Sequence, residues 1–243
     1  DSRIRLLTEM EKDYEGFNKA VKLVCQAKGE LRGIHGPVAS LIKTESRYSL
    51  AIEIALGAGL QNIVVDREED AKSAIAFLKR RDGGRATFLP LTAIHGEELR
   101  ENGVEREFGF VGVASRLVCF DPKYTQIFNN LLGRTVIAED LDCGIAMARK
   151  YRNAFRIVTL DGQVINRGGS MTGGSVSRSA GVLSRTAELE RLNSRIGELH
   201  QRLEDAKVAE AAAGRELEAA RYELTTAEAQ RRAAEDEVLR LEG

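Results

Sequence analysis

The hydrophobic positions in the C-terminal quarter of the chain follow a heptad repeat. From Leu189 to Leu241 an apolar residue recurs at alternating steps of three and four, and only Glu210 and Arg231 interrupt the series. A period of 3.5 kept up over about seven heptads, with Glu, Arg and Gln between, predicts a coiled-coil helix over residues 185–243. A single solvated helix is the alternative.

A shorter helical pattern opens the chain. Ile4, Leu7 and Tyr14 have similar spacing before Gly16 interrupts it, which predicts a helical stub over residues 1–15. If the two terminal helices leave the middle of the chain side by side, they run antiparallel. At about 1.5 Å per residue the C-terminal helix extends about 80 Å and the stub about 20 Å, so most of the long seam has no partner within the chain.

Between these helices one pattern of apolar segments occurs twice. Each copy reads helix, buried strand, helix and strand, and the first helix of each copy runs from a Tyr to a Leu-Gly pair. The predicted helices are 48–56, 68–81, 124–132 and 140–151, and the predicted strands are 62–66, 86–91, 135–139 and 155–160. We therefore predict an α/β (mixed α+β) globular domain of two similar halves, 16–100 and 101–184, flanked by antiparallel coiled-coil helices. Chance similarity between two ordinary units remains the alternative.

A glycine-rich run, residues 168–175 (GGSMTGGS), follows the second copy. It comes directly after Thr159 to Ile165, where Asp161-Gly162 predicts a hairpin with a two-residue turn. Four glycines within eight residues indicate backbone that bends sharply or lies against another backbone, because only a residue without Cβ does both cheaply.

Composition narrows the class of protein. The chain has 243 residues, 43% of them hydrophobic, and its 36 basic and 37 acidic residues give a net charge of -1, so binding to DNA or anionic lipid would need a local patch. No apolar stretch approaches the about 18 residues that span a bilayer. The odd count of three cysteines, Cys25, Cys119 and Cys143, fits no disulfide framework and predicts free core thiols in a cytoplasmic protein.

Catalytic and cofactor motifs do not fit the glycine run. Gly169 and Gly174 have the interval of the first two P-loop glycines, but Ser175 stands where the lysine belongs, and neither a dinucleotide fingerprint nor G-x-S-x-G occurs. The histidines have no metal-ligand spacing. We therefore expect no enzyme activity, no metal and no cofactor from this chain. An α/β domain that binds a small molecule or anion at the glycine run stays as an alternative.

Basic residues gather after the second copy. Five arginines against two glutamates lie between Arg167 and Arg195, where the globular part meets the coil. Such a patch could neutralise DNA phosphates, and that binding would weaken steeply with salt. We take Arg167, Arg178 and Arg185 as the candidate DNA contacts. A solvated basic face is the competing interpretation.

Four segments carry a family resemblance: LRGIHGPVASLI, YSLAIEIALGAGLQNIVV, RATFLPL and VINRGGSMTGGS, the last followed by heptads. Together, over about Gly16 to Arg185, they resemble the hinge of bacterial chromosomal SMC (structural maintenance of chromosomes) proteins. In that family the hinge closes one end of an antiparallel coiled coil whose other end is an ATPase head, and two hinges form a dimer in a molecule that organises and segregates chromosomes.

The resemblance implies a function for each part. The expected partners are a second copy of the chain, DNA bound weakly near the arm junction, and, in the parent protein, ATPase heads and accessory subunits, in a nucleoid-associated location. Val176-Ser177-Arg178 stands where relatives often carry several lysines. The implied dimer interface consists of Gly168, Gly169, Ser170, Met171, Thr172, Gly173 and Gly174. A dimer held only by the C-terminal coil remains a rival.

Overall fold

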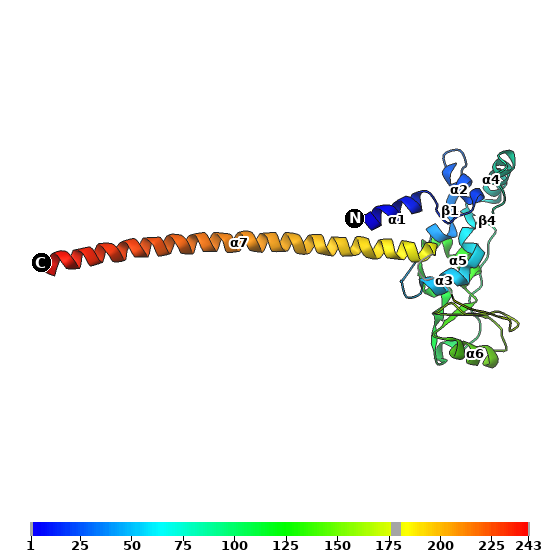
Figure 1. Ribbon diagram of the computed structural model, residues 1–243. Helices are drawn as coiled ribbons and strands as arrows, with labels where there is room; N and C mark the ends of the chain where they lie inside the picture. Colours follow the sequence, from blue (N-terminus) through cyan, green and yellow to red (C-terminus); the bar gives the residue numbers. More distant parts are fainter. Residues whose placement is uncertain (1, 176–180, 243) are drawn as a thin grey trace. The chain divides into compact units, whose positions relative to one another are not determined.

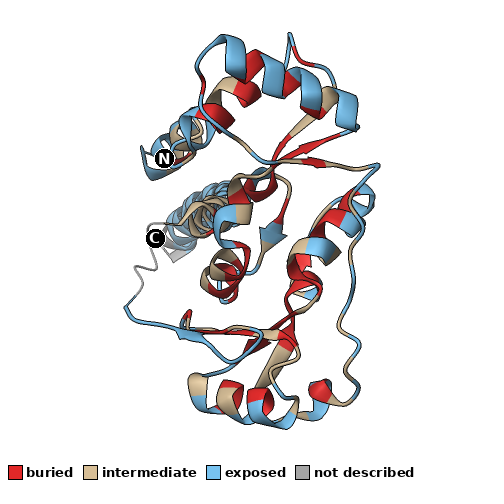
Figure 2. Cartoon of the chain, turned by 90° about the vertical axis from the view of Figure 1, so that its right-hand side faces the viewer, coloured by how far each residue is buried: buried red, intermediate tan, exposed pale blue. Residues whose placement is uncertain are grey.

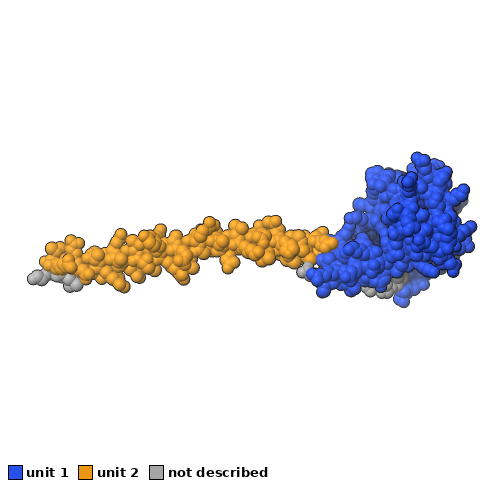
Figure 3. Space-filling model, turned by 90° about the horizontal axis from the view of Figure 1, so that it is seen from above, with its two compact units in different colours: residues 1–191 blue, residues 192–243 orange. Residues whose placement is uncertain are grey.

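The computed structural model describes residues 2–175 and 181–242 (Figure 1). The chain divides into two compact units, residues 1–191 and 192–243 (Figure 3). The second unit consists of the rest of one long helix, α7 (Val182–Glu242), which begins in the first unit. Arg178, one of the three candidate DNA contacts, lies outside the described residues.

The first unit contains the same series of elements twice. Each series runs strand, 3-10 turn, short strand, helix, strand, helix, strand, and the predicted helices and strands all occur within it. The first series is β1 (Ile34–Pro37), η1 (Val38–Ser40), β2 (Lys43–Thr44), α3 (Ser49–Leu56), β3 (Ile63–Val65), α4 (Glu68–Arg80) and β4 (Phe88–Pro90). The second series is β5 (Phe110–Val113), η4 (Ala114–Arg116), β6 (Val118–Cys119), α5 (Thr125–Leu132), β7 (Thr135–Ala138), α6 (Leu141–Lys150) and β8 (Arg156–Thr159).

Strand pairing repeats as well. In the first half β3 pairs antiparallel with β1 and parallel with β4, and in the second half β7 pairs antiparallel with β5 and parallel with β8. Both antiparallel pairs carry an irregularity at the same place, between Ile34 and Gly36 and between Phe110 and Gly112. The prediction of two similar halves is confirmed, and the repeat reaches further toward the N-terminus than the apolar pattern indicates. The residue boundaries of the halves stay a prediction.

The two halves share one core. Its central cluster joins side chains of α3 and α5, such as Ile52 and Phe128, and a ladder between β2 and β6 ties the halves together through their main chains. Smaller clusters lie under α2 (Lys19–Gln26) with α4, and under α6. Figure 2 shows the buried residues gathered on the strands and on the inner faces of these helices.

The second half carries two extra strands, β9 (Val164–Ile165) and β10 (Met171–Thr172). They extend its sheet to the order β10-β9-β8-β7-β5, whereas the first sheet stops at β1-β3-β4. The hairpin between β8 and β9 has a three-residue turn, not the predicted two. Thr159 N–H donates to the Gln163 carbonyl at 2.9 Å, and Gly162 has a φ of 91°, which is the geometry of a three-residue loop closed by a left-handed glycine.

Candidate functional site: the glycine edge and the arm root

The glycine run forms the outermost hairpin of the five-stranded sheet. β10 pairs with β9 in the register Met171 to Ile165 and Thr172 to Val164, and the turn is closed by the Asn166 N–H, which donates to the Ser170 carbonyl at 2.8 Å. Gly168 and Gly169 have φ values of 86° and 93°, which other residues rarely adopt. The first glycine pair therefore makes a tight turn.

Among the described strands none pairs with the outer edge of β10. Because the Asn166 and Ser170 pair is hydrogen-bonded, the next pair, Ile165 and Met171, turns its main-chain groups away from the β9–β10 ladder. The N–H and C=O of Met171 therefore face away from the sheet. All seven residues of the predicted interface are exposed, and Met171 keeps 52% of its surface.

The second glycine pair is held from inside the chain. The Gly174 N–H donates to Gln163 Oε1 at 2.9 Å, and Gln163 Nε2 donates to the Gly174 carbonyl at 3.2 Å. A Cβ on Gly173 would collide with the same Gln163 oxygen, whereas a Cβ on Gly168 or Gly174 would meet nothing within 4 Å. The four glycines thus serve different purposes.

The first sheet also ends in an open edge, along β4. The Ile63 N–H donates to the Thr87 carbonyl and the Leu91 N–H to the Val65 carbonyl, so these alternate residues of the β4 segment face β3 and the main-chain groups of Phe88 and Pro90 face outward. Proline has no N–H and is found in sheets mainly on edge strands. Within the described residues no strand pairs with this side of β4.

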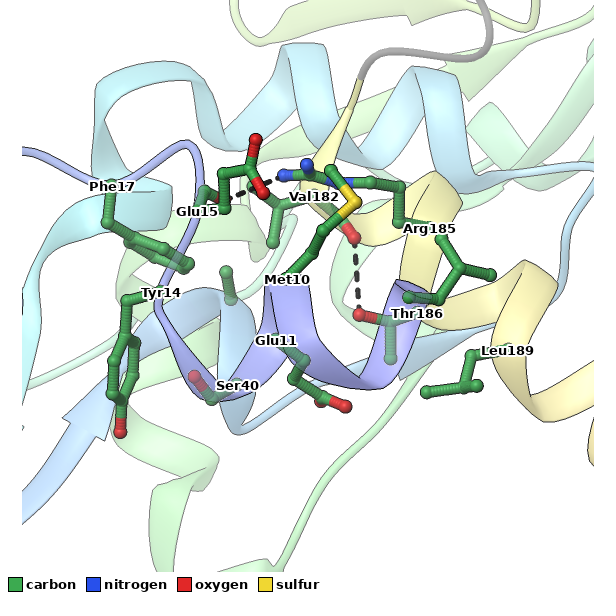
Figure 4. A pocket seen from close by; sticks show the side chains of 12 residues that line it. Met10, Glu11, Tyr14, Glu15, Phe17, Ser40, Val182, Arg185, Thr186 and Leu189 are labelled. Carbon is green, nitrogen blue, oxygen red and sulfur yellow. Dashed lines mark hydrogen bonds between the residues drawn. The ribbon is translucent and has the colours of Figure 1, made fainter. Parts of the chain in front are cut away.

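The arm root is the place where α1 (Ser2–Lys12) lies against the first turns of α7. The Arg3 guanidinium pairs with Glu188 at 2.9 Å, and Arg185 donates to the Glu15 carbonyl at 2.9 Å, so the two helices run antiparallel as predicted. A small pocket between them is lined by apolar side chains of both helices, including Met10 and Leu189 (Figure 4).

A carboxylate from α3 covers the start of α7. Glu53 Oε1 accepts the Val182 N–H at 3.1 Å, and Glu53 Oε2 is buried with no hydrogen-bond partner among residues 2–175 and 181–242. Burial raises the pKa of the Glu53 carboxyl, and the N–H groups that begin α7 act against that rise. Glu53 was not among the predicted residues. Its position as the one charged residue in the apolar helix SLAIEIAL is the signal that could have found it.

The candidate DNA contacts fall in different places. Arg167 is exposed in the turn between β9 and β10, while Arg185 is half-buried at the arm root and bonded to Glu15. The two arginines therefore belong to separate features of the fold, and Arg185 has a structural contact of its own.

The three cysteines and His35 lie in parts of the fold that indicate structural roles. Cys25 and Cys143 are buried as predicted, but Cys119 is exposed, because it lies on the short two-stranded ladder of β2 and β6 and not in a sheet covered on both sides. His35 joins the halves: Nε2 lies 2.7 Å from Asp66 Oδ1, and Nδ1 lies 2.9 Å from the Tyr124 hydroxyl. Among the described residues no group of three potential ligands could hold a metal ion, and none of the helices is long and apolar enough to cross a membrane.

Comparison with known proteins agrees with this architecture. Residues 31–148 match the family described as "SMC proteins Flexible Hinge Domain". A solved SMC hinge domain from Geobacillus stearothermophilus, described as an asymmetric dimer, is 40% identical, with a TM-score of 0.81 over 89% of this chain and 88% of that one. The chain belongs to the SMC hinge domain family.

Other relatives fit this assignment. The hinge domain of the Pyrococcus furiosus SMC protein is 32% identical, with a TM-score of 0.57 over 72% of this chain and 88% of that one. The Chromosome partition protein Smc of Bacillus subtilis is 45% identical over 83% of this chain and 17% of its own length. The chain thus spans about a sixth of that relative. An SMC hinge is not a catalytic fold, so the family agrees with the prediction that this chain is not an enzyme.

Proposed function

We propose that the hinge joins two copies of the chain through two equivalent contacts, each pairing β10 of one copy with β4 of the other. The observation that carries this proposal is that each sheet ends in an edge strand with outward-facing main-chain groups, β4 in the first half and β10 in the second. A two-fold axis that relates the copies brings each half of one copy against the other half of its partner, so β4 and β10 of both chains are used. The three-stranded and five-stranded sheets then continue across each contact.

The glycine run suits this contact because main chain must approach main chain. An open edge offers unpaired N–H and C=O groups to another strand, and strand addition satisfies them. Side chains at Gly168 or Gly174 would point into space that is empty in one copy, so their absence leaves room for the second. Met171, exposed and flexible, supplies an apolar contact at the middle of the edge.

Sedimentation equilibrium on the chain truncated after Arg191 tests whether the globular unit alone dimerises. That unit is compact, and it keeps the contacts of Arg3 and Lys43 with α7. We expect twice the monomer mass. If the truncated chain is a monomer while the intact chain is a dimer, the coil makes the dimer and the proposal is wrong.

The coiled-coil rival has its own support. Leu199, Leu203, Leu217 and Leu224 lie on the seam of α7 and keep between 47% and 60% of their surface exposed. Such a seam needs a helix partner to bury it. The anion-binding rival is weaker, because the N–H groups of Gly169 and Gly174 already donate within the chain and are not free to surround an anion.

The role of the hinge in its parent protein follows from the relatives. Because the curated relatives are named Chromosome partition protein Smc, we infer that the dimer connects two arms of a chromosome-partition ATPase. DNA contact is a second candidate, and among the described residues the exposed Arg167 supports it, in the turn between β9 and β10 and not at the arm root. Arg167→Glu should then weaken DNA binding at low salt, and unchanged binding would remove Arg167 from the site.

A further inference from the structure

We propose that Gln163 is a positioning residue for this interface, whose side-chain amide holds the backbone of Gly173 and Gly174 in place directly after β10, the strand that would meet a second copy. The inference rests on the proposed dimerisation through β10. It adds a residue outside the glycine run, on the preceding hairpin, to the parts that build the contact.

The ladder between β9 and β10 cannot continue by main chain alone. After Thr172 and Val164 the next hydrogen-bonded partners would be Gly174 and Gly162. The Gly162 N–H, however, already donates to the Thr159 carbonyl at 2.9 Å within the turn, and its φ of 91° bends the chain away. Without another partner the polar groups of Gly174 would be left to water.

The main chain of Gln163 is also unavailable to Gly174. Its N–H donates to the Thr159 hydroxyl at 2.8 Å, and its carbonyl accepts the Thr159 N–H at 2.9 Å, so both face β8. Only the side chain remains. Because a primary amide has both donor and acceptor, it replaces the missing ladder step with the two bonds to Gly174.

Asp161 fixes which way the amide points. Gln163 Nε2 lies 3.4 Å from Asp161 Oδ2, and the Thr159 hydroxyl donates to the other oxygen of the same carboxylate. A flipped amide would turn its oxygen toward this carboxylate and its nitrogen toward the Gly174 N–H, so both contacts would be lost. Thr159, Asp161 and Gln163 thus form one network that ends on the glycine edge.

The glycines differ in how they relate to this network. A Cβ on Gly173 would meet Gln163 Oε1, the end of a flexible side chain, so a substitution there would displace the amide from Gly174. Gly168 and Gly174 have no neighbour of that kind. A segment whose backbone is already held in one conformation loses less conformational freedom when it binds, so the clamp should favour association without touching the second copy.

Gln163→Ala tests the clamp in the full chain. We expect the dimer dissociation constant, measured by sedimentation, to rise about tenfold or more, since each dimer contains two clamps. Gln61→Ala is the matched control, because Gln61 also bonds a main-chain group, the Asn18 N–H at 2.8 Å, but on the first half. It should leave the dissociation constant unchanged. Gln163→Glu, which keeps an acceptor but loses both donors beside Asp161, should weaken the dimer as well.

Amide hydrogen exchange of Gly174 supplies a readout that a general loss of stability would not give. It is measured in a dimer-disrupted background, Gly168→Asp, with and without Gln163→Ala. We expect exchange at Gly174 to rise with Gln163→Ala while exchange at core amides such as Ile137 stays unchanged. If Gly174 exchange rises but the dissociation constant does not, the clamp does not position the interface and the inference is overturned.

A double-mutant cycle with Gly173→Ala completes the test. In the presence of Gln163 the new methyl collides with the amide, whereas with Gln163→Ala that collision is gone, so the fold-loss caused by Gly173→Ala should be smaller. Additive losses would contradict the inference. A wild-type globular unit that is monomeric in sedimentation would instead refute the proposed function. The failure of the clamp and the failure of the proposed dimer can therefore be told apart.

Discussion

The two halves of the hinge share their order of elements, their strand pairing and even the irregularity in the first ladder, yet they end differently. The first half stops at β4 with an open edge that contains Pro90, and the second adds β9 and β10 and ends in a glycine edge. Duplication therefore accounts for the scaffold. The proposed function lies in the difference, because two unlike edges can join head to tail whereas two equal halves would offer no such choice.

The largest effect should come from charge on the glycine edge. Gly168→Asp together with Gly174→Asp should abolish dimerisation of the globular unit, because an unpaired carboxylate buried at an interface is costly. The matched control is Asn at both positions, since Asn tolerates positive φ about as well as Asp but carries no charge. We expect the Asn variant to dimerise more tightly than the Asp variant by sedimentation. Equal, tight dimers of both would remove these glycines from the contact.

The first-half edge is tested by removing one N–H at a time. Phe88→Pro deletes an N–H that faces outward and also the side chain that packs against the α2–α4 cluster, so it should weaken the dimer about tenfold relative to Phe88→Ala, which deletes only the side chain. Leu89→Pro deletes an N–H on the side of β3 and should unfold the first half, as circular dichroism would show. If Phe88→Pro leaves the dissociation constant unchanged, β4 is not the partner of β10.

Much of this architecture could be predicted from the sequence. The helix expected at 68–81 is Glu68–Arg80, and the one at 140–151 is Leu141–Lys150, because amphipathic period and acidic first turns act locally. The ladder between β2 and β6 could not be predicted, since two-residue strands carry no periodic signal and pair across 75 residues of chain (Lys43 with Cys119 is such a pair).

The candidate site shows the same division. The glycine run, which is the proposed interface, could be found from the sequence because composition alone reveals it. Gln163 and Glu53 were missed, since their roles depend on which main-chain groups a distant segment leaves unpaired. Arg185 illustrates the converse, because a charge that suggested DNA is bonded to the Glu15 carbonyl at the arm root.

A moderate effect is expected at the arm root, where Glu53 of α3, a helix of the first half, accepts the Val182 N–H at the start of α7. Burial raises the pKa of Glu53 above the ordinary value of 4.5, so the folded state holds this proton more tightly than the unfolded chain. The protonated Glu53 carboxyl therefore makes its full contribution to the free energy of unfolding below about pH 4.5, and this contribution is lost as the pH rises through the raised pKa. Glu53→Gln keeps an acceptor for Val182 and removes the ionisation.

We would measure the difference in melting temperature between Glu53→Gln and wild type from about pH 4 to about pH 8. This range begins near the ordinary carboxyl pKa and extends above it, where a raised pKa takes effect. The variant should gain relative to wild type as pH rises. Glu53→Ala, which deletes the cap, should cost about 1 kcal/mol at neutral pH. A pH-independent difference for Glu53→Gln would contradict this account of the group.

The smallest effect should come from the ion pair between the two terminal helices. Arg3 and Glu188 are both partly exposed, so Arg3→Ala should change the free energy of unfolding very little, and the change should shrink further in high salt. Denaturant unfolding at two salt concentrations checks this. A loss of stability as large as that caused by Leu7→Ala would mean that α1 depends on this pair as much as on buried Leu7.

The pairing of β10 with β4 is tested most directly by cysteine cross-linking between copies. One chain carries Met171→Cys and the other Phe88→Cys, both with Cys119→Ser because that thiol is exposed. Facing strands bring Cα atoms within the about 4.4 to 6.8 Å that a disulfide bridges, and a short bis-maleimide allows for a shift of register. The account predicts a cross-linked dimer only when the two chains are mixed. Cross-linking of the Met171→Cys chain with itself would show that β10 pairs with β10, and would contradict the head-to-tail contact.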